Sequence, residues 1–269
     1  MQQHDAHGLE PIVEALARSV DALPEVHRIG RGEVPELAEL ERALEVFRSI
    51  CFPGFFGARS GGDRDAHAFL GVAVSQLHAA LVPQFERAVR AASAETADAH
   101  GLAQGWFATV LAETPRIREL LAADAREALA ADPAARSLDE IILCYPGLHA
   151  MVTHRFAHAL HGLGVPLVPR MLAEIAHRRT GIDIHPGARI GPGLFIDHGT
   201  GVVIGETTVI GRQCRIYQGV TLGALTPELD RGGRVERGQK RHPTLGDRVV
   251  VYAGATILGG DTVIGDGAT

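Results

Sequence analysis

Aliphatic residues recur every six positions in the last third of this 269-residue chain, and no other feature constrains its fold as tightly. The recurring positions are Ile184, Ile190, Ile196, Ile204, Ile210, Ile216, Leu222, Leu245, Val251, Ile257 and Val263. Two breaks interrupt the rhythm, an eight-residue step from Ile196 to Ile204 and a polar stretch over 224–243. Neither the period of a helix nor that of a strand explains this spacing. A six-residue repeat predicts a parallel β-helix, in which three hexapeptides make one triangular coil and the aliphatic side chains form interior columns.

Residues 1–180 show the period of helices instead. Apolar residues recur at three- and four-residue spacing over 36–50, 66–92 and 138–164. We place Pro35 as the first residue of the first of these helices and Gly164 at the end of the last one. The sequence therefore predicts an α+β fold, with an α-helical N-terminal domain over 1–180 and a β-helix domain over 181–269.

Composition argues against several classes of function. The net charge of −6 comes without a long basic run, which disfavours nucleic acid as the main partner. Cys51, Cys144 and Cys214 form no CxxC pair, so the sequence supports neither a zinc ribbon nor a disulfide framework, and a reducing compartment fits. The N-terminus lacks a secretion signal, and no apolar run approaches the roughly 18 residues of a membrane span. We therefore expect a cytoplasmic protein with no membrane partner.

Five short motifs make the pattern more specific. They are DPA at 132–134, DIHP at 183–186, DHGTGVVIGET at 197–207, GVTLG at 219–223 and RHP at 241–243. Together with the helical N-terminal half, they resemble the serine acetyltransferases, a family of hexapeptide-repeat acyltransferases, from about residue 130 onward. The resemblance implies that the β-helix is left-handed, which the usual right-handed crossover preference would not give.

The resemblance also implies substrates and partners. Such enzymes transfer an acetyl group from acetyl-CoA to the hydroxyl of L-serine, giving O-acetylserine for cysteine synthesis, with no tightly bound cofactor or metal. They are typically homotrimers with acyl-donor sites between neighbouring prisms, and the sequence leaves open whether two trimers pair. The chain ends at Thr269 within a repeat. Since an open coil leaves strand edges unpaired, we expect a further tail, which in the family contributes to feedback inhibition by cysteine and docks onto O-acetylserine sulfhydrylase.

The eight-residue step is where we expect the reacting histidine. Two extra residues disrupt one coil there and let Asp197 and His198 project from the prism. A hydroxyl is a poor nucleophile until a base removes its proton, and histidine can do so near neutral pH. By the resemblance, Asp183 accepts the other ring N–H of His198, as the carboxylate of a hydrolase triad does. The fifteen residues between them are compatible with proximity.

The resemblance assigns further substrate contacts. His242 is a second active-site histidine. Arg241 binds the serine carboxylate, a task that its planar guanidinium suits. Asp132 and Asp197 receive the serine ammonium group.

The coenzyme A site is implied in the same way at Gly223, Ala224 and Ala253. A backbone N–H near Gly223 and Ala224 is the candidate that stabilises the oxyanion. Family members often have a second glycine where Ala224 stands, but an alanine still offers its N–H. The stretch 224–243 is longer and more charged than the family's loop, which leaves the fine selectivity for the acceptor open.

Three other functions stay open at this point. Another hexapeptide acetyltransferase, acting on a sugar or a related alcohol, would use the same kind of histidine without needing DPA or Arg241. A zinc carbonic anhydrase on the same prism would need His185, His198 and His242 to converge between subunits. A scaffold that only oligomerises would need neither His198 nor His242. The DHGTG and RHP contexts favour the transferase.

Overall fold

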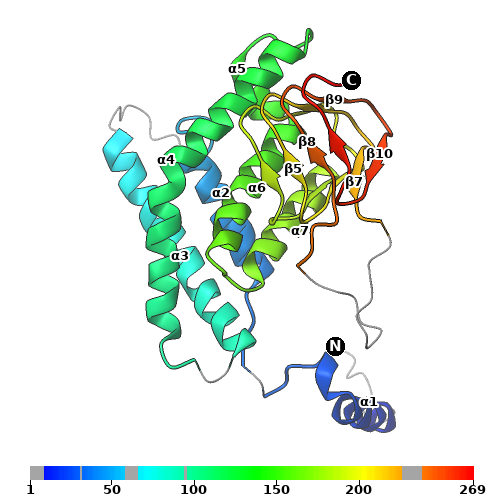
Figure 1. Ribbon diagram of the computed structural model, residues 1–269. Helices are drawn as coiled ribbons and strands as arrows, with labels where there is room; N and C mark the ends of the chain where they lie inside the picture. The colour runs from blue at the N-terminus through cyan, green and yellow to red at the C-terminus, as the bar shows by residue number, and fades with distance from the viewer. Residues whose placement is uncertain (1–8, 31, 58–65, 94–95, 226–237) are drawn as a thin grey trace, which may run out of the picture.

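A computed structural model describes residues 9–30, 32–57, 66–93, 96–225 and 238–269 (Figure 1). Helices fill the N-terminal half and short strands the C-terminal part, as the change of period predicts. The helical elements are α1 (Glu10–Ala22), the 3-10 turn η2 (Pro24–Val26), α2 (Leu37–Cys51), α3 (Ala66–Ala92), α4 (Ala99–Ala131), α5 (Leu138–Cys144), α6 (Pro146–Gly162) and α7 (Val168–Thr180).

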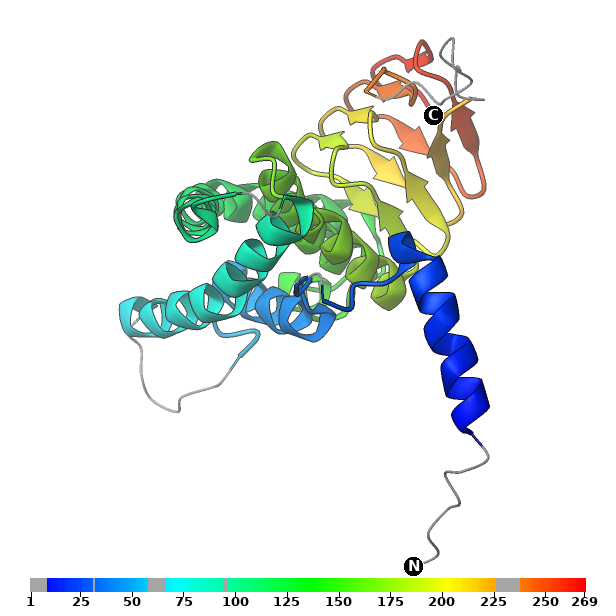
Figure 2. The same cartoon turned by 90° about the horizontal axis from the view of Figure 1, so that it is seen from below.

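The helices α2, α3, α4, α6 and α7 pack together, whereas α1 has no buried residue and lies apart from them in both views (Figures 1 and 2). By length and hydropathy α3 could cross a membrane. Its side chains Leu77, Leu81 and Phe85 are buried among α2 and α4, whereas Val72 is 61% exposed.

The placement of Pro35 as the first helical residue is wrong, because α2 begins at Leu37. Glu36 has an extended backbone, and its N–H donates to the Gln84 side chain of α3 at 2.7 Å. This contact with a helix far along the chain delays the helix start.

The stretch 138–164 forms two helices rather than one. Pro146 begins α6 and disfavours a helical conformation of the residue before it, so Tyr145 has an extended backbone between α5 and α6. Gly164, with φ of 75°, ends the second helix as predicted, through an N–H that donates to the His161 carbonyl. The break matters for the site, because it leaves Tyr145 outside both helices, where its hydroxyl donates to Asp132.

The C-terminal part is a parallel β-helix (Figure 2). Its strands form three sheets, ordered β1-β4-β7-β10, β2-β5-β8-β11 and β3-β6-β9, in which every pair is parallel. The strands are β1 (Ile182–Ile184), β2 (Arg189–Ile190), β3 (Phe195–Ile196), β4 (Val202–Ile204), β5 (Val209–Ile210), β6 (Arg215–Ile216), β7 (Thr221–Gly223), β8 (Thr244–Leu245), β9 (Val250–Val251), β10 (Thr256–Leu258) and β11 (Val263–Ile264).

The aliphatic residues of the repeat stack inside the prism in register. Ile204 pairs with Leu222, and Ile210 pairs with Leu245. The assignment of Val263 to this series is wrong, because Val263 is 67% exposed and Ile264 pairs with Leu245 in its place. The turn around Gly259 (φ 96°) carries one more residue than the equivalent turns of the first two coils, which shifts the last strand by one position.

A buried ion pair joins the helices to the prism. Arg155 of α6 donates two hydrogen bonds of 2.7 Å to the carboxylate of Asp124 on α4. The backbone N–H groups of Gly193 and Leu194 donate to the same carboxylate, and Arg155 also donates to the carbonyls of 190–191. These bonds fix α4 and α6 against the first coil. The last helix ends at Thr180 and β1 begins at Ile182, but the hydrophobic core is continuous, so the division into two domains stays a prediction.

The column of β2, β5, β8 and β11 allows a matched test of the packing. Ile210 is 2% exposed between two coils, so Ile210→Ala should lower the free energy of unfolding by about 2–5 kcal/mol. Ile264→Ala makes the same change in the last described coil, where the side chain is only half-buried and should cost clearly less. Urea unfolding followed by circular dichroism measures both, and equal losses would contradict the column.

Candidate active site

The eight-residue step forms an enlarged corner after β3. His198 lies there in the left-handed region with φ of 56°, a backbone conformation that few residues other than glycine adopt. Its side chain is 72% exposed, and its Nδ1 lies 3.8 Å from a carboxylate oxygen of Asp197, which is 22% exposed. The corner therefore presents an imidazole to solvent beside a carboxylate, as the break in the repeat predicts.

The helical half supplies two more side chains to this corner. Asp132, directly after α4, accepts hydrogen bonds from the Ala134 N–H at 2.8 Å and the Tyr145 hydroxyl at 2.5 Å. The Tyr145 hydrogen bond, the Ala134 N–H and the nearby His198 lower the pKa of Asp132. Burial and the Asp132 and Asp197 carboxylates raise the pKa of Tyr145. Asp132, Tyr145, Asp197 and His198 thus lie within mutual electrostatic reach, and we call them the His198 group.

His242 is held at a different corner. Its side chain is buried, and Nδ1 accepts hydrogen bonds from the Thr207 backbone N–H at 3.1 Å and from the Thr207 hydroxyl at 2.9 Å. Since Nδ1 is an acceptor, the proton of the neutral ring belongs on Nε2. The ring packs against Gly205, where a Cβ would stand 2.0 Å from Cδ2 and Nε2, so only glycine fits. Burial, and then the charge of Arg241, lowers the pKa of His242.

Arg241 lies at the same corner and is paired with Glu206. Its guanidinium donates to the Glu206 carboxylate at 2.5 Å, and its backbone N–H donates to the Thr207 hydroxyl at 2.9 Å. Partial burial opposes ionisation of Glu206, but the Arg241 hydrogen bond and the charges of His185, Arg241 and His161 together lower the pKa of Glu206. We call Glu206, Thr207, Arg241 and His242 the His242 group.

The two groups lie at opposite ends of the strands in the sheet β1-β4-β7-β10. The His198 corner joins β3 to the start of β4. The residues of the His242 group lie beyond the other end of these strands, between β4 and β5 and directly before β8. In the described ranges no hydrogen bond or ion pair links the groups. His185 lies on the side of the His242 group, near Glu206, so one chain does not bring His185, His198 and His242 together.

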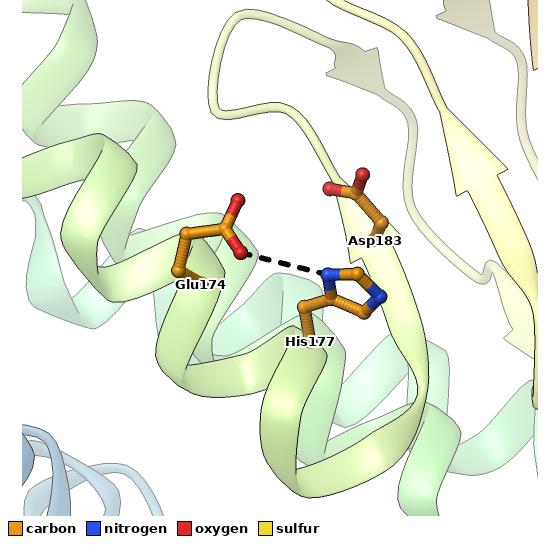
Figure 3. Close-up of side chains that lie close together, drawn as sticks. All are labelled: Glu174, His177 and Asp183. Carbon is orange, nitrogen blue, oxygen red and sulfur yellow. Dashed lines mark ion pairs between the residues drawn. The ribbon is translucent and has the colours of Figure 1, made fainter.

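Asp183 has different neighbours from those predicted. It lies on β1 opposite Val203, and its carboxylate is close to Glu174 and His177 of α7 (Figure 3). The described residues show no hydrogen bond between Asp183 and His198, so their pairing stays a prediction.

The predicted coenzyme A residues also lie at two separate places, some beside the His242 group and one on the side of the prism that carries His198. Gly223 ends β7 and precedes Ala224, at the edge of the His242 group. Ala253 follows β9, in the corner that is stacked two coils beyond that of His198, and is exposed. Most of the 224–243 stretch, residues 226–237, lies outside the described residues.

The sequence did not identify Tyr145, Thr207 and Glu206 as site residues. Thr207 and Glu206 close the DHGTGVVIGET motif, so their place beside a site could have been inferred. Tyr145 had one usable signal, its position directly before Pro146, where a helix must restart.

No family model matches the chain. A plasmid-encoded serine acetyltransferase of Synechococcus elongatus is 44% identical over 273 residues, covering 97% of this chain and 85% of the relative. Two further curated serine acetyltransferases, of Synechocystis and of Synechococcus elongatus, match over about half of their length. Among solved structures, Entamoeba histolytica serine acetyltransferase isoform 3 in complex with cysteine has a TM-score of 0.70 and 40% identity, covering 88% of this chain and 78% of that one. A serine acetyltransferase in complex with CoA has a TM-score of 0.51 and 32% identity, covering 61% and 63%.

These likenesses confirm the predicted fold class, a helical N-terminal half followed by a left-handed parallel β-helix. They also confirm the predicted class of enzyme, an acyltransferase, and support serine acetyltransferase over the sugar acetyltransferase, carbonic anhydrase and scaffold alternatives.

The histidine beside Glu206 gives the fold a pH dependence. Burial, and then the charge of Arg170, lowers the pKa of His185 to about 4. The unfolded chain takes up that proton near pH 6.5, so it binds more protons than the fold does between about pH 6.5 and pH 4. The free energy of unfolding should therefore fall as the pH falls through this window.

In His185→Gln, the slope of the free energy of unfolding against pH should decrease by up to the amount that corresponds to one bound proton. Urea unfolding at a series of pH values measures this slope. His100→Gln, at an exposed position of α4, is the matched control for removing an imidazole. An unchanged slope in His185→Gln would show that His185 is not buried in its neutral form.

Proposed function

We propose a reaction for this chain, which belongs to the serine acetyltransferase family. It transfers the acetyl group of acetyl-CoA to the hydroxyl oxygen of L-serine and releases O-acetylserine and CoA. The observation that carries the proposal is the His198 group, in which an exposed imidazole stands beside two carboxylates at the corner that the eight-residue step enlarges.

His198 acts as the general base. Its imidazole takes the proton of the serine hydroxyl while the oxygen attacks the thioester carbonyl, and the proton then passes to the departing CoA sulfur. Asp183 is the proposed acceptor of the other ring N–H. This requires the His198 side chain to turn from Asp197 toward β1, and its 72% exposure leaves it free to do so.

The serine ammonium group is bound by Asp132 and Asp197. Two hydrogen bonds hold the Asp132 carboxylate in place, and its lowered pKa keeps it charged near neutral pH. Tyr145 acts as a positioning residue, because its hydroxyl binds one carboxylate oxygen and leaves outer lone pairs for the substrate.

The serine carboxylate is bound by the His242 group. Arg241 supplies the charge, with its guanidinium plane oriented by Glu206. His242 supplies a neutral Nε2–H donor, since Nδ1 is taken by Thr207. Because the two groups lie at opposite ends of the strands of one sheet, a complete site needs the His198 group of one chain to face the His242 group of another. A ring of three chains with heterologous contacts meets this requirement.

Acetyl-CoA lies in the same groove between two prisms, along Gly223 and Ala224 of one chain and Ala253 of the next. The Ala224 N–H donates to no acceptor among the described residues, which leaves it free for the oxyanion. A solved relative in complex with CoA supports coenzyme A as the carrier. We also propose that two trimers pair, that the protein docks onto O-acetylserine sulfhydrylase, and that it is located in the cytoplasm.

Release of the CoA thiol from acetyl-CoA, with L-serine or other alcohols as acceptors, tests the reaction. His198→Ala should lower kcat by about 10²–10⁴-fold, the usual contribution of a general base. Gln213→Ala is the matched control, because Gln213 is also an exposed residue with positive φ at a prism corner. Serine-dependent release that survives in His198→Ala would contradict the role of His198. Turnover of another alcohol, with none of serine, would reassign the acceptor.

A further inference from the structure

Three potential metal ligands meet where the helical half joins the prism (Figure 3). Glu174 and His177 are three residues apart on α7, so they share one face of the helix. Gly181 ends the helix in the left-handed conformation, with φ of 72° and an N–H that donates to the His177 carbonyl at 2.8 Å. This turn brings the chain back at once into β1, which places Asp183 beside the last turn of α7.

The distances suit a chelate better than a hydrogen-bonded cluster. The ligand atoms of the three side chains all lie within 4.8 Å of one another. Glu174 Oε2 is 3.5 Å from His177 Nδ1, too far for a strong hydrogen bond. Two ligands on tetrahedral zinc, each at about 2.0–2.1 Å from the ion, are themselves about 3.4 Å apart. The Glu174–His177 pair is already close to this spacing. Because no two of the ligand atoms are more than 4.8 Å apart, shifts of up to about 1.4 Å would bring in the half-buried Asp183.

The lone pairs that a metal would need are available. The Asp183 carboxylate accepts no hydrogen bond from any described residue. Arg170 holds the other carboxylate oxygen of Glu174 at 3.0 Å, which orients Oε2 toward His177.

The positive charges that follow His177 are compensated elsewhere. Arg178 pairs with Glu41 and Arg179 with Glu45, both on α2. The cluster therefore keeps two carboxylates and one imidazole without a competing cation bound to Asp183. One imidazole and two carboxylates form a ligand set that suits zinc and similar transition ions, and water can complete the coordination.

We propose that Glu174, His177 and Asp183 bind a divalent transition metal ion, and that its binding inhibits acetyl transfer by withdrawing Asp183 from His198. The inhibitory part rests on the proposed function, in which Asp183 must accept the ring N–H of His198. A carboxylate that ligates a metal beside α7 cannot at the same time serve as that acceptor. The site would thus link the activity to the free concentration of the metal.

Binding is measured first, on the full chain after treatment with EDTA, by titration with Co²⁺ followed in the visible spectrum and with Zn²⁺ followed by calorimetry. One ion should bind per chain. His177→Ala should weaken binding by more than about tenfold, because even residues behind metal ligands contribute about 10–100-fold. Glu174→Gln is the second variant, and His100→Ala, at an exposed helical position, is the matched control. Unchanged affinity in both His177→Ala and Glu174→Gln would overturn the site.

Inhibition is measured next, as serine-dependent thiol release in the presence of Zn²⁺ at the concentrations that saturate the site. The wild type should lose activity and recover it on addition of EDTA. His177→Ala should keep its activity at the same Zn²⁺ concentration. Zn²⁺ that binds at the site without inhibiting would overturn the link to Asp183. An EDTA-treated wild type that is inactive with serine would instead refute the proposed function, and the binding titration would still decide the metal site.

Discussion

The buried ion pair between Asp124 and Arg155 determines how the two halves of the molecule meet. Its carboxylate also accepts two backbone N–H groups of the first coil, so α4, α6 and the prism share one set of buried hydrogen bonds. Removing one partner of such a pair typically costs about 3–5 kcal/mol, because the other charge is left buried and unpaired. Glu127, one turn further along α4, adds a second link to Arg215 of β6. Asp132 follows at the end of this anchored helix and is therefore held at the His198 corner.

The prism imposes the second constraint on the site. Its corners lie between neighbouring sheets. A residue after β3 and a residue before β8 are therefore separated by the length of the strands in the sheet β1-β4-β7-β10. His198 and the Asp132 carboxylate belong to one corner, and Arg241 and His242 to another. Neither group alone offers both a base and a cation for the substrate carboxylate. The proposed reaction therefore requires an interface between copies, because a rigid coil places these corners apart. The same proposed interface would bring the divided coenzyme residues together.

The sequence predicted what depends on local spacing and missed what depends on distant contacts. The six-residue repeat indicates the β-helix, and its eight-residue break marks His198, because both are properties of one continuous stretch. Val263 was misplaced because a single extra residue in the turn at Gly259 shifts the strand, and the repeat alone does not reveal a turn's length. Tyr145 reaches Asp132 only because Pro146 divides a helix. The neighbours of Asp183 come from α7, whose position against β1 is set by packing.

The claim that the site is assembled from two chains can be tested by mixing two inactive variants. His198→Ala removes the base from one face of the interface, and Arg241→Ala removes the carboxylate anchor from the other. If the chains are dissociated together and reassembled in equal amounts, about one quarter of the interfaces combine an intact His198 with an intact Arg241. The account predicts serine-dependent activity near that fraction of the wild type. Mixed assemblies that form, as native mass spectrometry would show, yet stay inactive would contradict it.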